Sequence, residues 1–145
     1  MKRFFFPLRR VLDLRPTQAH IEETKLARLH AELRGLEDRI HHARRERAAS
    51  ERALAQTGAA TGAELAALDS FKKAVAAECA RLESMAGAAR RKIALQIEAL
   101  AAKRRDARLL ENLERRKLAA WKLEFAKELD QQAEEAHQAR WRKQR

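Results

Sequence analysis

The chain contains no proline after Pro16 and only one place where two glycines lie close together. That place is the run Thr57-Gly58-Ala59-Ala60-Thr61-Gly62, and the long stretches on either side of it have helical composition and spacing. Glycine and proline are the residues that most often interrupt a helix. The sequence therefore predicts an all-α fold, a long antiparallel two-helix coiled-coil hairpin with unequal arms.

We expect one helical-hairpin domain over residues 1–145. Its elements are predicted as a helix at about 17–57, a turn at 58–62 and a second helix at about 63–143. Pro16 disfavours helical geometry at the residue before it, so the first helix is expected to break or begin there. Gly87 could break the second helix, because glycine in a helix interior costs about 1 kcal/mol relative to alanine.

Apolar residues recur at alternating steps of three and four along both predicted helices, which is the pattern of a coiled-coil seam. The seam positions of the first helix are Ala19, Leu26, Leu29, Leu33, Leu36, Ile40 and Ala43. Those of the second are Leu65, Leu68, Val75, Cys79, Leu82, Ala86, Ala89, Ile93 and Leu100. The polar residues that interrupt the seam are Glu22, Lys72 and Gln96.

Beyond residue 100 the apolar steps change to three, four and four, a spacing typical of a straighter supercoil. The residues concerned are Ala107, Leu110, Leu118, Trp121, Phe125 and Leu129, with Glu114 as a gap. At 1.5 Å per residue the second helix would extend about 120 Å and the first only about 60 Å. Much of 113–145 is therefore expected to lack a partner within the chain. Trp121, Phe125 and Trp141 lie there, and large aromatics on an unpaired helix favour a protein interface.

The net charge of +11 is concentrated at the two ends of the sequence. Residues 1–15 and 137–145 each carry +4, whereas residues 16–136 carry +3 from 23 basic and 20 acidic residues. Because a hairpin brings its termini together, these two segments are expected to form one basic end that suits an acidic partner.

Several classes of function are disfavoured by what the sequence lacks. The five histidines and the single Cys79 have no metal-ligand spacing, and no Lys-Ser or Lys-Thr follows the glycine run as in a phosphate-binding loop. We expect no enzyme, no metal and no cofactor. No apolar run approaches the ~20 residues of a membrane helix, and Phe4–Leu8 is too short for a signal-peptide core, so a cytosolic protein is expected.

Two stretches of the sequence follow a known pattern. One is Phe6-Pro7-Leu8-Arg9-Arg10-Val11-Leu12-Asp13-Leu14-Arg15, and the other is Leu109-Leu110-Glu111-Asn112-Leu113-Glu114-Arg115-Arg116-Lys117 followed by Trp121. Both resemble the flagellar export protein family FliJ. Lys127-Glu128-Leu129-Asp130 is similar to the family's C-terminal pattern, whereas Phe125-Ala126 departs from it. The injectisome counterparts, the YscO group, are also similar, so both export systems stay open.

The resemblance implies a non-enzymatic, antiparallel coiled-coil stalk, similar to the central stalk of rotary ATP synthases. It implies a cytoplasmic protein, peripheral at the cytoplasmic face of the inner membrane, with three partners: a hexameric export ATPase, a membrane export gate protein and export chaperones. In that family a Phe and an aliphatic residue four positions later bind the gate, and Phe71 and Val75 match that pair.

Docking in the ATPase ring is expected to use the basic ends and the aromatic stripe. The residues we assign to it are Arg9, Arg10, Trp121, Phe125, Arg140, Arg142 and Arg145. Phe71 lies next to Lys72, so its ring either faces a partner or replaces Lys72 in the seam. Two other functions stay open: a generic cytosolic coiled-coil scaffold, and a non-specific nucleic-acid-binding coiled coil. No nucleic-acid partner is expected, because no groove-reading motif is present.

Overall fold

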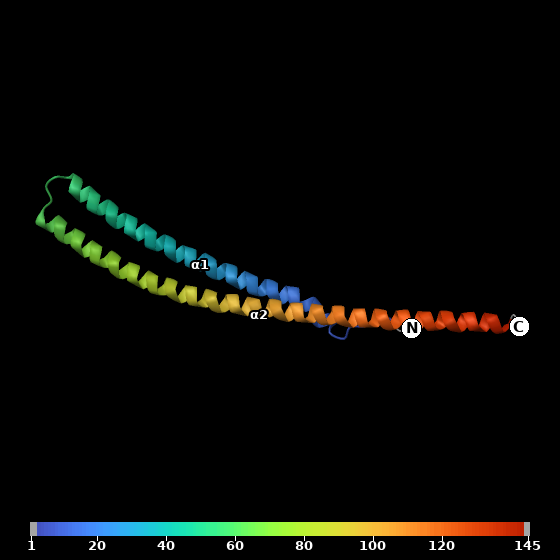
Figure 1. The fold of residues 1–145 in the computed structure, drawn as a ribbon. Helices are drawn as coiled ribbons and strands as arrows, with labels where there is room; N and C mark the ends of the chain where they lie inside the picture. Colours follow the sequence, from blue (N-terminus) through green and yellow to red (C-terminus); the bar gives the residue numbers. More distant parts are fainter. Residues whose placement is uncertain (1–2, 144–145) are drawn as a thin grey trace. The chain divides into compact units, whose positions relative to one another are not determined.

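Two long α-helices make up almost all of the part of the chain that the computed structural model describes, residues 3–143 (Figure 1). α1 spans Arg9–Gln56 and α2 spans Gly62–Lys143. These residues contain no strand. With 48 residues in α1 and 82 in α2, the predicted all-α hairpin with unequal arms is confirmed.

The chain divides into two compact units. The hairpin unit is Ile21–Leu100, which contains the turn and the parts of both helices that flank it. The terminal unit combines the described residues of Met1–His20 with those of Ala101–Arg145. No helix of residues 3–143 is both long enough and apolar enough to cross a membrane.

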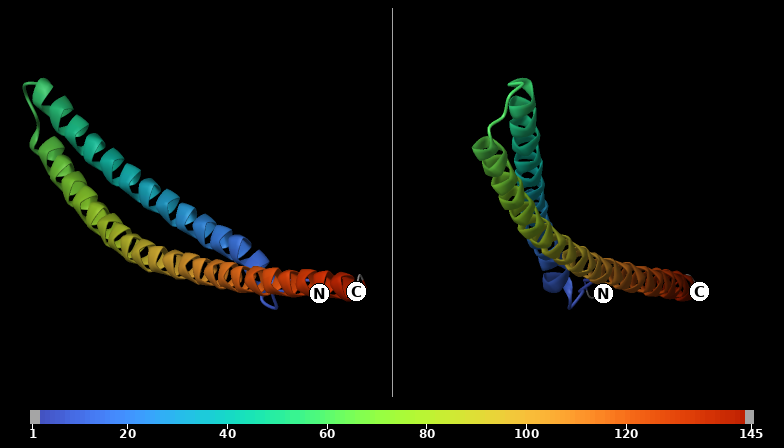
Figure 2. Two further views of the ribbon diagram at one scale, coloured as in Figure 1. Left: turned by 45° about the vertical axis from the view of Figure 1, so that its right-hand side comes forward. Right: turned by 90° about the vertical axis from the view of Figure 1, so that its left-hand side faces the viewer.

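In the hairpin unit α1 and α2 run antiparallel along a narrow apolar seam (Figure 2). Its core cluster consists of Leu36, Ile40, Val75, Cys79, Leu82, Ala86 and Ala89, all of them predicted seam positions. Leu82 is only 1% exposed. Cys79, Ala86 and Ala89 of α2 have small side chains, which allow the backbones of the two helices to lie close together. The middle of the predicted seam is therefore the core of this unit, whereas the predicted seam residue nearest the turn, Leu65, is 53% exposed.

The turn forms where the glycine run predicted it. Gly58 has a φ of +68°, in the left-handed region that favours glycine after a helix end. At the start of α2 the Glu64 N–H donates to Thr61 Oγ1 at 3.2 Å, and the Thr61 N–H donates to Glu64 Oε2 at 2.8 Å. This reciprocal capping box satisfies two backbone donors and fixes the first turn of α2. The Thr61 N–H also lowers the pKa of Glu64.

In the terminal unit the N-terminal segment and the first turns of α1 pack along α2. Phe6 and Leu12 are buried there. The half-buried residues of the facing α2 stripe are Ala107, Leu110, Glu114, Leu118, Trp121 and Phe125, which follow the predicted three-four-four spacing. Leu129 is exposed, as is every described side chain after it, so the half-buried part of the stripe ends at Phe125.

Two predicted helix boundaries differ from those observed. α1 begins at Arg9 rather than near residue 17, and Pro16 lies inside it. A proline removes one backbone donor from the helix, and the seam residues on both sides of it, Leu12 and Ala19, still turn inward. α2 continues through Gly87, where an added Cβ would meet only Arg91 Nη1 at 3.8 Å.

Candidate partner-binding surfaces

The polar residues that interrupt the seam of the hairpin unit have partners across it. Gln96 Nε2 donates to the backbone carbonyl of Glu22 at 3.1 Å and also to its carboxylate. Near the turn, Lys72 Nζ lies 3.3 Å from Glu51 Oε1, and Arg47 Nε donates to the same oxygen at 3.0 Å. Arg47 first, and then Lys72, lower the pKa of Glu51. These groups hold the two arms in register and are not free to bind a partner.

The two residues that match the gate-binding pair have different environments. Val75 belongs to the core cluster and is 9% exposed, so its side chain is not offered to a partner. The exposed pair implied by the resemblance is therefore not present, because position 75 faces α1. Phe71 is half-buried and packs against the same core cluster.

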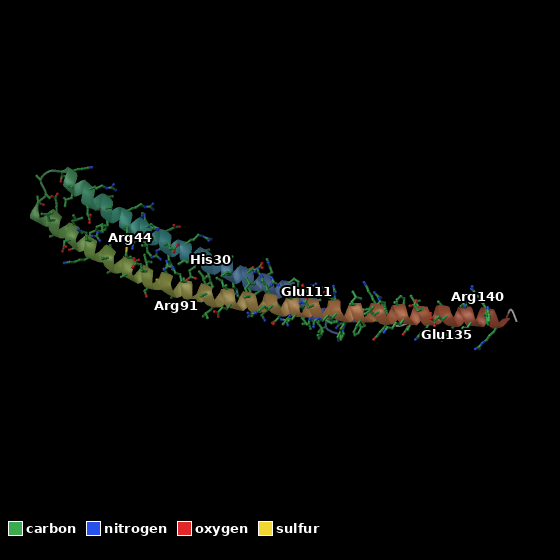
Figure 3. The ribbon with its side chains drawn as sticks, in the orientation of Figure 1. His30, Arg44, Arg91, Glu111, Glu135 and Arg140 are labelled. Atoms are coloured by element: carbon green, nitrogen blue, oxygen red, sulfur yellow. The ribbon has the colours of Figure 1, made fainter. Side chains whose placement is uncertain are left out.

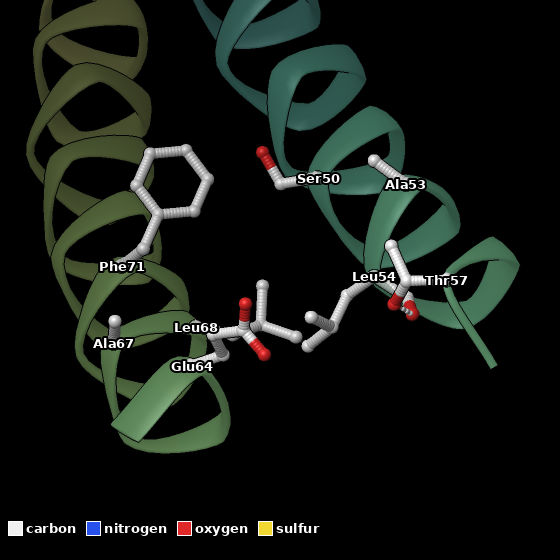
Figure 4. Close-up of a pocket in the computed structure, with 8 residues that line it drawn as sticks. All are labelled: Ser50, Ala53, Leu54, Thr57, Glu64, Ala67, Leu68 and Phe71. Atoms are coloured by element: carbon white, nitrogen blue, oxygen red, sulfur yellow. Dashed lines mark hydrogen bonds between the residues drawn. The ribbon is translucent and has the colours of Figure 1, made fainter. Parts of the chain in front are cut away.

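Phe71 also lines an open groove of about 460 Å³ between α1 and α2 next to the turn (Figure 4). Its lining residues are Ser50, Ala53, Leu54, Thr57, Glu64, Ala67, Leu68 and Phe71. Leu54 and Leu68 point toward each other across the groove, and the Phe71 ring lies above them in the view. Because its lining is mainly apolar and it lies beside Phe71 at the tip of the hairpin, the groove is a candidate binding surface near the expected gate site.

Arg9, expected to dock to an ATPase, is bound within the terminal unit. Its Nη1 donates to Glu114 Oε1 at 2.8 Å, and its Nε lies 3.1 Å from Asp13 Oδ1. The hydrogen bond to Glu114 is the main cause of a raised pKa for Arg9. Glu114, which interrupts the apolar stripe, therefore has a specific partner on α1. Arg10 is exposed.

Trp121 and Phe125 belong to an aromatic cluster with the N-terminal segment. The Trp121 ring centroid lies 5.3 Å from that of Phe125, stacked at 9°, and 6.0 Å from that of Phe4. Lys117 Nζ lies 6.0 Å from the Phe6 ring centroid. The spacing of residues in the sequence does not place Phe4 and Phe6 in this cluster. The sequence signal for this contact is the aromatic run Phe4–Phe6, which could supply a partner for the apolar stripe of α2.

The described residues of the two basic segments do not meet, in contrast to the expected single basic end. Residues 4–15 pack against α2 between Asp106 and Trp121. Arg140 lies 19 residues beyond Trp121, about 28 Å along the helix axis. Figure 3 shows Glu135 and Arg140 on a stretch of α2 with no neighbouring helix. Arg140 and Arg142 are exposed there, and Arg145 lies outside the described residues.

Comparison with protein-family models, with curated proteins and with solved structures finds no match to this chain. Within residues 3–143 no three histidine, cysteine, aspartate or glutamate side chains gather in a way that could hold a metal ion. The candidate surfaces are therefore defined by their own geometry: the groove at the turn, the N-terminal aromatic segment and the uncovered end of α2.

Proposed function

We propose that this chain is the non-enzymatic coiled-coil stalk of a type III export apparatus, flagellar or injectisome. It docks in the hexameric export ATPase, couples the ATPase to the membrane export gate protein and escorts export chaperones. It acts in the cytoplasm, peripherally at the cytoplasmic face of the inner membrane.

The observation that supports this proposal is the meeting of the two stretches that resemble the FliJ family. They are about 100 residues apart in sequence, yet Arg9 of the first donates to Glu114 of the second. Phe6 of the first likewise lies under Lys117 of the second. Short helical motifs can match by composition alone. Residues that match in both stretches and also contact one another are harder to explain in that way.

The surfaces that remain exposed in the structure indicate which residues would contact each partner. We assign ATPase docking to the end of α2 after Phe125, where every side chain from residue 126 to residue 142 is exposed, Arg140 and Arg142 included, and no helix lies alongside α2 (Figure 3). Exposed arginines suit acidic surfaces and are frequent binding hot spots. We assign the gate contact to the groove that Phe71 lines rather than to Val75, which is buried.

Stimulation of ATP hydrolysis by a purified type III export ATPase tests the docking assignment. The double variant Arg140→Glu, Arg142→Glu should weaken the apparent affinity for the ATPase about tenfold or more, since it replaces two interface cations with anions. The matched control is Arg34→Glu, Arg45→Glu, which makes the same charge change at two exposed positions of α1 in the hairpin unit.

Equal effects of the two double variants would contradict the assigned surface. No stimulation by the unmodified chain, together with no recovery of an export ATPase or chaperones from native cytosol, would contradict the proposed function itself. Far-UV circular dichroism of each variant establishes that its helices are intact.

A further inference from the structure

The three consecutive phenylalanines near the N-terminus do not share one environment. Phe6 is 4% exposed, and Phe4 is half-buried against Trp121. Phe5, between them, is 79% exposed. Successive side chains of an extended segment point to opposite sides. Because Phe4 and Phe6 pack inward, Phe5 between them points outward. Phe5 is thus the one ring of the three that is exposed to the surroundings.

Further apolar side chains are exposed immediately after it. Leu8, Val11 and Leu14 are exposed, whereas Leu12 turns into the unit. Residues three apart on a helix form a continuous ridge. Residues 3–14 therefore display one large aromatic ring and an apolar ridge, although Phe6 and Leu12 already supply buried contacts that hold the segment to α2.

This apolar surface lies in a strongly basic part of the chain. Arg3 and Arg10 are exposed on either side of Phe5 and Leu8, and residues 1–15 contain five basic residues against one acidic. The terminal unit as a whole has 18 basic and nine acidic residues, whereas the hairpin unit has 14 and 12. The chemistry that complements the segment is an apolar layer covered by negative charge.

We propose that this N-terminal segment docks on an anionic lipid membrane. Phe5 and the ridge of Leu8, Val11 and Leu14 enter the boundary between headgroups and acyl chains, and Arg3 and Arg10 bind lipid phosphates. Aromatic and aliphatic side chains combined with clustered arginines are what interfacial membrane binding requires. A second copy of the chain is a poorer occupant, because it would bring two basic surfaces together. The inference does not depend on the export-stalk proposal.

The test is co-sedimentation of the full chain with vesicles of phosphatidylglycerol, of phosphatidylcholine and of an equal mixture. Binding should be at least about tenfold stronger to phosphatidylglycerol than to phosphatidylcholine, and should weaken as salt is raised. Phe5→Ser and, separately, Arg10→Glu should each weaken binding to the anionic vesicles about tenfold.

Matched controls make the same changes elsewhere. Leu95→Ser alters an apolar residue of the hairpin unit that is 68% exposed, and Arg45→Glu alters an exposed arginine of the same unit. Both should bind like the unmodified chain. Phe5→Trp adds a fluorescent ring at the docking position, and its contribution to the emission should shift to shorter wavelength with anionic vesicles only.

Three results would overturn the proposal: no vesicle binding, equal binding to both lipids, or equal weakening by Phe5→Ser and Leu95→Ser. Analytical ultracentrifugation without lipid checks the other occupant. A concentration-dependent dimer that Phe5→Ser abolishes, without vesicle binding, would assign the surface to a second copy. Failure of the ATPase assay leaves the vesicle result unchanged, so the two proposals fail separately.

Discussion

Glu51 contacts cations on both helices of the hairpin unit. Its carboxylate lies 3.0 Å from Arg47 Nε on α1 and 3.3 Å from Lys72 Nζ on α2. These neighbours hold the pKa of Glu51 below its ordinary value of 4.5, Arg47 contributing most. The folded chain therefore protonates this carboxylate less readily than the unfolded chain does, which links folding to its ionisation.

Acidification should consequently destabilise the hairpin. The contribution of Glu51 is fully present above its unfolded-state pKa of 4.5 and is lost as the pH falls through the lower pKa of the folded state. We predict that Glu51→Gln reduces the drop in melting temperature between about pH 6 and about pH 3, measured by circular dichroism. The control is Glu32→Gln, an exposed position of α1. An equal reduction in both variants would contradict the prediction.

At the scale of the helices, the arms are aligned by apolar packing and by polar pairs within it. The core cluster from Leu36 to Ala89 supplies the burial, and the contact of Gln96 with Glu22 lies further from the turn. A uniform apolar seam tolerates sliding by a heptad, whereas a polar pair inside it is satisfied in only one alignment. The pair therefore contributes more to the register than to stability.

Replacing the polar pair should separate these two effects. Gln96→Leu alone should lower the free energy of unfolding by about 1–2 kcal/mol, because the carboxylate of Glu22 loses its donor in a partly buried site. The double variant Gln96→Leu, Glu22→Leu should recover this loss and exceed the unmodified chain by about 1 kcal/mol or more. Urea denaturation measures both. Additive losses in the double variant would show that the pair is not coupled.

At the scale of the whole molecule, burial and charge are unevenly distributed. The hairpin unit contains the continuous apolar core and nearly balanced charge. The terminal unit has twice as many basic as acidic residues, and its buried apolar residues are Phe6 and Leu12. From residue 126 to residue 142 every side chain of α2 is exposed. Helix formation without tertiary packing is marginal in water, so local stability should differ widely along the chain.

Amide hydrogen exchange followed by mass spectrometry should reveal these differences. We predict the slowest exchange in α2 from Cys79 to Ile93, where the seam is most buried, and exchange faster by at least about 100-fold in 126–142. Addition of a partner that binds the end of α2 should slow exchange in 126–142 specifically. Uniform protection along α2 in the free chain would contradict the prediction.

The sequence was sufficient to predict the fold because each local signal agreed with the others. The heptad steps identified the buried residues from Leu36 to Ile93, and the glycine run identified the turn. The prediction that α1 begins near residue 17 was wrong. Pro16 lies inside the helix, because the loss of one backbone donor did not outweigh the packing around it. The tendency of proline to end a helix was overridden by the burial of neighbouring residues such as Leu12, which exists only in the folded structure.

The candidate surfaces were less predictable, because they depend on which end of each helix is covered. Residue spacing did not show that Phe4 and Phe6 pack against the α2 stripe, or that Phe5 is left outward. The same contacts explain why the two basic segments are far apart. For Val75 the sequence supported two predictions. The heptad pattern predicted a buried seam residue, whereas the resemblance implied an exposed binding residue. The structure agrees with the heptad pattern.

Cys79 is the only thiol in the chain and lies in the core cluster between the two helices. A water-soluble alkylating reagent can reach its sulfur only after the arms have parted at that point. The rate of its modification therefore measures how often the middle of the hairpin unit opens, with no probe added to the protein. Comparing that rate with and without a bound partner would show whether the partner binds a closed hairpin or one whose two helices have separated.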